Sequence, residues 1–536
     1  MTRVAVATSI LLMLGRLRNH ALVATPEHAP LGSYDPVGIL MLTGDASPAP
    51  VLVRAAYVVA WIATFALLAG AWTRIAAAVS LAASLLTVSY AVSFTPDWPH
   101  DNNLPLLALL ALQGTRGGDV AGVDGWLRRR RGSPPPPSDG YEWTPRLVQL
   151  ICALMFLAAA AFKMAHAHFT LSWALSDNLR HQILAQFDVN HLPRTPVAEW
   201  LVAEPWRYRT AALLNLVNQL LPIVACVCVN RPRLRALFGA SFVLEMVGIG
   251  LVMGLWDLHW LPLVAVFVDW SRLVAWIQRA PRVTEGDAMP MRARRRISTF
   301  VAAFVAYDVL VSFAHPRIDH RLRTYPFSTY PMFALIRARR PYDVHQDYHF
   351  VHGRFRVVGA GARATELEDW IHSGFVYRKL HRIDDPETLR TRLGEILDNL
   401  RRRYPGVPVD AVQLWCTVYH VPAYPAPPRL EAHDVGLMGE LTAGGAWTSA
   451  MTRAEPLGGG EVALSIPVAL DRPGARVIAR VDGDLAPRPL PVERRGHSVV
   501  IAPPEGTIVM IALETTRPDG TPLSLLLARR SRNAWW

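Results

Sequence analysis

A succession of long apolar segments occupies the first 315 or so residues and constrains the fold more than any other feature of this 536-residue chain. A segment of about 18 apolar residues or more can cross the hydrocarbon core of a bilayer as a helix, in which every backbone polar group is satisfied internally. Candidate spans lie near residues 4–17, 51–70, 75–94, 103–114, 146–165, 209–229, 235–254, 257–277 and 298–315. The sequence therefore predicts a multispanning α-helical membrane domain of about eight or nine helices over residues 1–316.

Arginines between the candidate spans predict the orientation of the helices. Basic residues concentrate in the cytoplasmic loops of membrane proteins, so the basic connections at 114–146, 231–235 and 279–296 are expected to be cytoplasmic. Everything after about residue 316 then lies outside the cytoplasm, as expected of a multi-pass protein of the cell membrane with an extracytoplasmic C-terminal domain. Arg16 and Arg18 fall on the opposite side, and they interrupt a signal-peptide pattern, which favours an uncleaved first helix.

The net charge of +12 does not indicate nucleic-acid binding, because many of the arginines flank candidate spans. Of the four cysteines, Cys152, Cys226 and Cys228 lie in predicted spans and only Cys416 lies in the second half. This distribution provides neither a disulfide framework nor a CxxC metal site. The expected partners are the lipid bilayer, a lipid-soluble molecule and an outward-facing polypeptide, and no nucleic acid is expected.

Lys163 is the most informative residue within the candidate spans. It lies in the apolar run from Ile151 to Ala165 and is one of two lysines in the chain, the other being Lys379. Arginine stays protonated almost anywhere, whereas a lysine amine that is shielded from water can lose its proton and act as a base. Ionisable groups inside membrane helices are expensive and usually functional. The alternative is a lysine near a helix end that extends to the interface or pairs with an acid.

Three acidic residues within the spans are candidate partners for Lys163. They are Glu245, Asp269 and Asp308, of which Glu245 is the deepest in its apolar run. A tight pair with Glu245 would favour a structural role for the lysine, and a pocket that joins Lys163 to the outer surface would favour catalysis.

Two outward-facing segments place polar side chains near span ends. One carries His100, Asp101, Asn102 and Asn103 at the mouth of the fourth span, and the other begins with His166 just beyond Lys163. Histidine changes charge near neutral pH and can relay protons or bind metal. The other explanation is that such residues simply prefer the wet interface.

The order of these motifs resembles a known family. The segments are Ala159-Ala160-Ala161-Phe162-Lys163-Met164 followed by Phe169 to Leu175, the run Leu106 to Gln113 behind the polar mouth, and Phe327-Ser328-Thr329-Tyr330-Pro331-Met332-Phe333. Over about residues 1–340 the chain is similar to the horizontally transferred transmembrane (HTTM) domain family, whose known enzyme is the vitamin K-dependent gamma-glutamyl carboxylase.

The resemblance implies a reduced lipid quinone as cofactor and oxygen-linked oxidation or carboxylation. It implies Lys163 as the base, with His100 and Asn103 as further catalytic candidates. Candidates for binding substrate or cofactor are Asp101, Asn102, His166, Phe169 and Trp173. The chain departs from the family pattern where Phe169 replaces a tryptophan, Ser172 a glycine and Asn103 a histidine.

The second half of the chain reads as a soluble region of mixed structure. Residues 347–358 and 409–418 alternate like strands, and residues 386–404 have helical spacing. Short apolar runs at 462–470, 476–481, 498–501 and 507–513 are separated by turn sequences. The sequence therefore predicts an extracytoplasmic α+β segment over 317–435 and a small β-sandwich-like domain over 436–536.

A row of alternating residues, Asp343, His345, Asp347 and His349, would share one side of an extended chain. Such a row suits a divalent metal, but a solvated strand face explains it equally well, and the sequence assigns no metal site.

Two functions are compatible with these features. The first is an integral-membrane enzyme, with Lys163 as base, that acts on a lipid-soluble quinone or an outward-facing polypeptide. The alternative is a non-catalytic lipid-binding or anchoring protein that presents an outward β-rich interaction module.

Overall fold

A computed structural model gives the architecture of two units. One comprises Met1–Arg180 and Arg194–Asp343, and the other comprises His181–Pro193 and Val344–Trp536. The structure describes the chain except for residues 17–22, 27–33, 35, 45, 95–99, 114–121, 134–142, 190–192, 229, 271–290, 315–344, 346, 374–382, 384, 453, 459–460, 468–474, 483–487, 503–507, 518–519, 532–533 and 536. Lys379, Asp343 and the segment 327–333 therefore lie outside the described residues.

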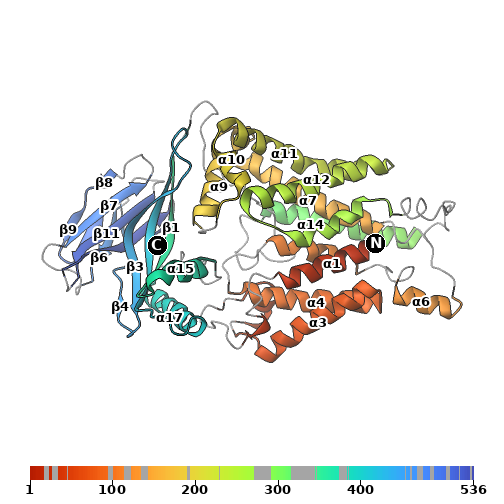
Figure 1. Cartoon of the computed structure of the whole chain (residues 1–536), viewed down its shortest axis with the longest axis horizontal. Helices are drawn as coiled ribbons and strands as arrows, with labels where there is room; N and C mark the ends of the chain where they lie inside the picture. The colour runs from red at the N-terminus through yellow and green to blue at the C-terminus, as the bar shows by residue number, and fades with distance from the viewer. Residues whose placement is uncertain are drawn as a thin grey trace. The chain divides into compact units, whose positions relative to one another are not determined.

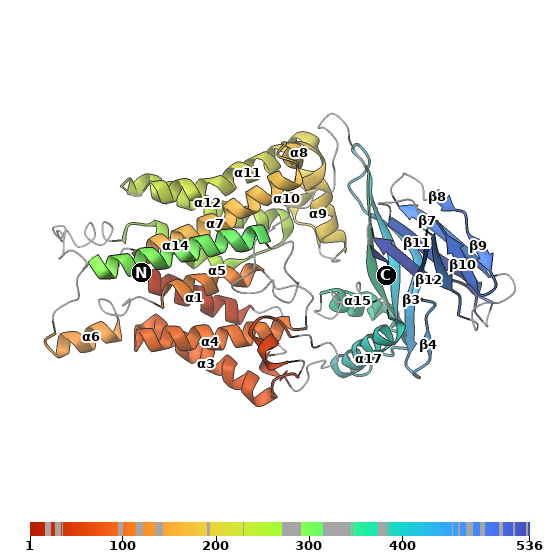
Figure 2. The same ribbon diagram turned by 180° about the vertical axis from the view of Figure 1, so that it is seen from behind.

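The first unit is helical (Figures 1 and 2). Five of its helices are long and apolar enough to cross a membrane: α3 (Pro50–Ala69), α4 (Thr73–Val92), α7 (Trp143–His166), α11 (Pro205–Val227) and α12 (Pro232–Met253). They confirm the spans expected near 51–70, 75–94, 146–165, 209–229 and 235–254 and are consistent with a multi-pass membrane protein.

The remaining candidate spans are shorter or more polar than expected. The segments are α1 (Thr2–Gly15), α5 (Asn103–Ala111), the 3₁₀ helix η6 (Leu258–Phe267) and α14 (Met291–Ala314). The span expected over 257–277 is described only in part: residues 258–267 form η6, a 3₁₀ helix with Pro262 inside it, and residues 271–277 lie outside the described part. Proline removes a backbone donor, and a 3₁₀ helix rarely extends far.

Short helices and 3₁₀ turns complete the helical unit. They are η3 (Gly38–Thr43), η4 (His100–Asn102), α6 (Val123–Arg130), α8 (Ser172–Leu175) and α10 (Pro196–Val202), and α9 (Asn178–Val189) continues into the second unit.

Apolar side chains on the outer face of α3 and α11 are exposed, as expected for helices in contact with lipid. Val58, Ile62 and Phe65 of α3 and Leu214 and Val217 of α11 are all more than 45% exposed. Figures 1 and 2 show α3 beside α4, where the Thr64 and Ser80 hydroxyls form a 2.7 Å hydrogen bond. The Thr64 and Ser80 hydroxyls thus lie between the two helices, whereas the apolar side chains named above face outward.

The second unit is built on two β-sheets. The larger has the order β1-β2-β3-β12-β11-β7-β8, in which β4 pairs with β3 and β13 with β12; the smaller has the order β5-β6-β10-β9. The strands are β1 (Tyr348–Val358), β2 (Ala411–Val421), β3 (Glu431–Thr442), β4 (Trp447–Thr448), β5 (Glu455–Gly458), β6 (Glu461–Ser465), β7 (Arg476–Asp482), β8 (Arg488–Leu490), β9 (Glu493–Arg495), β10 (Ser498–Ile501), β11 (Ile508–Thr516), β12 (Pro522–Ser531) and β13 (Ala534–Trp535). The boundary expected near residue 435 falls within β3.

Two apolar cores lie on opposite faces of the large sheet. Ile511 of β11, Leu525 of β12 and Leu464 of β6 share the core between the two sheets. Their neighbours Met510 and Leu526 point to the other face, where helices η9 (Gly361–Arg363), α15 (Ala364–Ser373) and α17 (Pro386–Arg403) lie (Figure 1). Strand side chains alternate between faces, so this arrangement follows directly from the sequence pattern. The predicted β-rich region is confirmed, and its side of the membrane stays a prediction.

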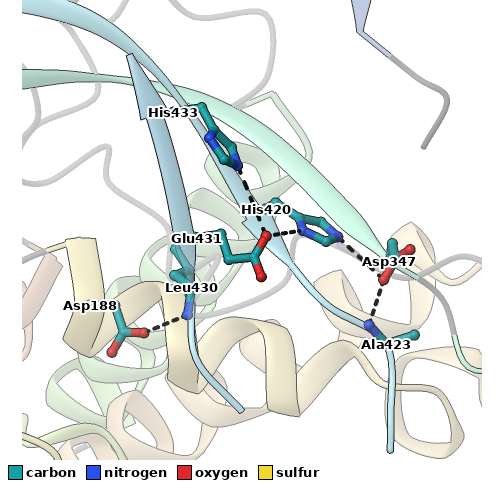
Figure 3. A network of polar contacts seen from close by, with 7 residues as sticks. All are labelled: Asp188, Asp347, His420, Ala423, Leu430, Glu431 and His433. Atoms are coloured by element: carbon teal, nitrogen blue, oxygen red, sulfur yellow. Dashed lines mark hydrogen bonds and ion pairs between the residues drawn. The ribbon is translucent and has the colours of Figure 1, made fainter. Parts of the chain in front are cut away.

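A polar network ties the ends of β1, β2 and β3 together (Figure 3). The His420 ring lies between two carboxylates, with Nδ1 3.2 Å from Glu431 and Nε2 3.4 Å from Asp347. Asp347 also accepts a hydrogen bond from the Ala423 backbone, and Asp188 of α9 accepts one from Leu430. Of the four residues in the alternating row, Asp347 thus belongs to a strand-end network, and the side chains of Asp343 and His349 lie outside the described part.

Candidate functional site

Lys163 lies near the C-terminal end of α7 and is buried, with a side chain that is 1% exposed. The run of alanines that precedes it, Ala158–Ala161, lets neighbouring helices approach α7 closely. An amine in such a place requires polar partners from those helices, because an unpaired buried charge is costly.

Two amide side chains of α11 supply these partners. The Lys163 Nζ donates to Asn215 Oδ1 at 2.5 Å and to Gln219 Oε1 at 3.1 Å. Asn215 and Gln219 are four residues apart and therefore share one face of the helix. Both carbonyl groups point at the lysine, so their amide nitrogens point away from it.

Those amide nitrogens bind the carboxylate of Glu245 on α12. Glu245 accepts hydrogen bonds from Asn215 at 2.5 Å, from Gln219 at 2.8 Å and from Asn218 at 2.9 Å. Glu245 is 4% exposed. In this part of the structure Lys163 and Glu245 form no direct ion pair, and two amides connect them instead.

Trp173 of α8 covers the remaining side of the amine. The Lys163 Nζ lies 4.4 Å from the centre of the Trp173 ring, and the tryptophan is 1% exposed. A cation over the face of an aromatic ring is stabilised by the ring's quadrupole. We name the set Lys163, Trp173, Asn215, Asn218, Gln219 and Glu245 the lysine–amide–glutamate network.

The sequence identified Lys163, Trp173 and Glu245, but it missed the three amides between them. A signal was present, because Asn215, Asn218 and Gln219 recur at helical spacing within the otherwise apolar stretch 211–227 of α11. Buried amides in membrane helices bind other helices or a ligand.

The polar mouth of the fourth span lies in a different environment. Asp101 and Asn102 belong to η4, and Asn103 begins α5. The backbone carbonyl of Asp101 accepts hydrogen bonds from His259 Nε2 and Trp260 Nε1 of η6. His100 begins η4, and its side chain is outside the described part.

The residues that follow Lys163 are largely exposed. His166 contacts the Phe162 carbonyl of its own helix, and Phe169 is 79% exposed. His168 and Phe169 both have positive φ, which places a sharp turn between α7 and α8 and brings Trp173 back onto Lys163. The described contacts therefore bring Trp173 to the lysine, while His166 and Phe169 point toward the surroundings.

Chemically, the network places one ionisable amine among groups that bind it in either protonation state. A neutral amine has two hydrogens to donate, and two amide oxygens accept them. The third hydrogen of an ammonium ion has the Trp173 ring nearby. The carboxylate behind the amides balances the positive charge.

Comparisons of the chain with protein-family models, with curated proteins and with solved structures give no match in any of the three.

Proposed function

We propose that this protein is an integral-membrane enzyme in which Lys163 exchanges protons with a lipid-soluble substrate, as the resemblance to the vitamin K-dependent carboxylases implies. The observation that carries the proposal is the pair of amide oxygens on the Lys163 amine, because they match the two hydrogens of its neutral form. An amine held in this way can accept and release a proton without reorganising its neighbours.

The network also favours the charge that develops when Lys163 takes up a proton. Stabilisation by groups that are already in place is typically a large term in catalysis, because no reorganisation accompanies the reaction. Trp173 lies against the amine, and Glu245 lies behind the amides as the counter-charge.

The proton donor that the resemblance implies is a reduced lipid quinone. Apolar side chains exposed along α11, such as Leu214 and Val217, are compatible with a substrate that arrives from the bilayer. When bound, such a quinol would supply an acidic hydroxyl group and the electrons for a reaction with oxygen. Lys163 would accept the hydroxyl proton, and Trp173 and the α11 amides would hold the resulting ammonium ion.

The test is quinol-dependent oxygen uptake by purified protein in lipid nanodiscs, with reduced menaquinone and reduced vitamin K as substrates. Lys163→Arg is the decisive variant, because a guanidinium group keeps the positive charge and donates to amide oxygens but does not lose its proton. We expect wild-type turnover to fall at least about 100-fold in both Lys163→Arg and Lys163→Ala. Retained turnover in the arginine variant would exclude Lys163 as the base.

A second candidate function is lipid binding or anchoring without catalysis, with the β-rich unit outside the cell as an interaction module. The observation that favours it is that every hydrogen of a Lys163 ammonium ion has a partner, so the network is complete as a connection between α7, α11 and α12. Absence of turnover with either quinol, together with a loss of stability in Lys163→Ala, would support this function.

A further inference from the structure

The helical unit contains a second group of ionisable side chains, at the junctions that lead into η6 and α5. One ligand atom from each of Asp101, Asp257 and His259 lies within 4.8 Å of the others. Metal–ligand distances of about 2.0–2.2 Å place ligand atoms no more than about 4.4 Å apart. The two carboxylate oxygens and the imidazole nitrogen therefore lie close to the spacing that a single cation imposes, and small side-chain rotations bring them onto it. Acidic groups that lie close together do not by themselves make a metal site, so the burial and the hydrogen bonds of each side chain must also be considered.

His259 is the informative side chain. Its Nε2 lies 2.9 Å from the backbone carbonyl of Asp101. A carbonyl oxygen has no hydrogen to give, so Nε2 must be the nitrogen that donates. In the neutral ring Nδ1 then carries the lone pair. His259 is 3% exposed, and its Nδ1 has no hydrogen-bond partner among the residues that the structure describes.

This is the arrangement that metal-binding histidines use. A ligating histidine usually donates its other ring N–H to a backbone carbonyl or a carboxylate, which fixes the tautomer and the ring orientation. Trp260 Nε1 donates to the same Asp101 carbonyl at 2.7 Å, so residue 101 is held against η6 by two bonds. The Ser9 hydroxyl of α1 donates to the backbone carbonyl of His259 at 2.5 Å and so holds the backbone of His259 in place.

The acidic side chains complete the set. Asp101 Oδ1 is buried and has no hydrogen-bond partner within the described part of the chain. Asp257 precedes η6, just after Gly254 (φ 71°) turns the chain at the end of α12. Arg16 donates to the neighbouring Trp256 carbonyl, and its charge offsets one of the two carboxylates. A net charge of about −1 remains when both carboxylates are ionised and the histidine is neutral.

We propose that Asp101, Asp257 and His259 bind a divalent first-row transition-metal cation, of the kind that manganese and zinc represent. Carboxylates suit manganese and imidazole suits zinc, and a three-ligand set leaves coordination positions for water or a substrate. The cation would neutralise the two half-buried carboxylates and join η4, η6 and the end of α12. The sequence row of Asp343, His345, Asp347 and His349 plays no part in this site.

The experiment uses the full chain in nanodiscs of zwitterionic lipid, stripped of metal with EDTA and titrated with Mn²⁺. Electron paramagnetic resonance measures the free ion, and electron spin-echo modulation detects a coordinated imidazole nitrogen. We expect one Mn²⁺ per chain, displaced by Zn²⁺, with nitrogen modulation that His259→Gln removes. Loss of an outer-shell partner alone weakens metal binding about 10–100-fold, so Asp101→Asn and Asp257→Asn should each weaken it by at least that much.

Two comparisons keep the test independent of folding. Asp398→Asn alters an exposed carboxylate of α17 and should leave Mn²⁺ binding unchanged. The wild-type protein alone decides the nitrogen ligand, whatever the variants do. Absence of stoichiometric binding, absence of nitrogen modulation in the wild-type complex, or binding that survives both aspartate substitutions would each overturn the proposal.

Discussion

Replacement of Lys163 by methionine should destabilise the helical unit more than any other single substitution in the network. Methionine is also unbranched and is one atom shorter than lysine. The change leaves the carboxylate of Glu245 without its counter-charge and the oxygens of Asn215 and Gln219 without a donor. Each of the two orphaned acceptors costs about 1–3 kcal/mol, which gives about 2–6 kcal/mol for both. We expect a loss of about 2–6 kcal/mol in the free energy of unfolding.

A second change in the same background isolates the contribution of the Glu245 charge. Glu245→Gln in the Lys163→Met protein removes the uncompensated charge, and the amides of Asn215, Asn218 and Gln219 can then pair with a fourth amide. The double variant should therefore be more stable than Lys163→Met alone, and the double-mutant cycle should give a coupling energy of about 0.5–3 kcal/mol, the range for residues of one network. Far-ultraviolet circular dichroism during unfolding in mixed detergent micelles measures the helix that is lost.

Gln149→Met provides the matched control. Gln149 is a buried amide of α7, the helix that also carries Lys163. It donates to the Val266 carbonyl at 2.5 Å and has no described hydrogen bond to the network. Its loss should cost about 1–3 kcal/mol and should add to the cost of Glu245→Gln within about 0.5 kcal/mol. If the costs of Lys163→Met and Glu245→Gln also simply add, the amides do not couple the two charges, and the interpretation of the network is wrong.

Two further predictions concern the β-rich unit. Burial alone would raise the pKa of the Glu440 carboxyl, but hydrogen bonds from Arg517, at 3.0 Å to each oxygen, and from Gln413 outweigh it and hold the pKa below its ordinary value of 4.5. The stabilisation of the folded state by ionised Glu440 is therefore complete above about pH 4.5 and is lost as the pH falls through the lower pKa of the folded state. Arg517→Ala should flatten the fall in the free energy of unfolding at acidic pH. Arg495→Ala, which removes one member of an exposed ion pair, should leave that fall unchanged. Gly436→Ala would place a methyl group 2.8 Å from the Leu526 backbone nitrogen and should lower the free energy of unfolding in urea by about 1–3 kcal/mol. In the control Gly394→Ala, the new methyl group would lie 3.6 Å from Leu441 in the middle of α17 and should raise that free energy by up to about 1 kcal/mol. An unchanged free energy of unfolding in Gly436→Ala would show that β3 and β12 are not tightly packed.

Local patterns in the sequence predicted the elements whose side chains repeat regularly. The alternation of residues 347–358 and the helical spacing of 386–404 correspond to β1 and α17 within one or two residues. By contrast, β3 and β12 were missed. Gly436 and Gly439 interrupt the pattern of β3, and their reason is non-local, because β12 approaches Gly436 and the Trp447 ring covers Gly439. The sequence of residues 431–442 alone does not predict that β12 and Trp447 approach these glycines.

In the candidate site too, single residues could be predicted from the sequence, whereas the contacts between them could not. A lysine and a glutamate in apolar runs stand out individually, since charged groups in such runs are rare. Their connection depends on how α7, α11 and α12 pack. The amides that form this connection do not stand out in the sequence of α11. The link between Asp101 and His259 spans 158 positions in the chain and depends on one backbone carbonyl.

The amides between Lys163 and Glu245 keep the two charged groups from exchanging a proton directly. In a medium as apolar as lipid, a directly bonded lysine and glutamate can neutralise each other by moving one proton, and the pair then carries no charge with which to act. An amide presents an oxygen to one partner and an N–H group to the other, so it keeps the two apart while it polarises both. All of the described contacts follow this one direction, with oxygens toward Lys163 and nitrogens toward Glu245. A network built only to join helices has no need to separate its charges, whereas an amine that exchanges protons with a third molecule does.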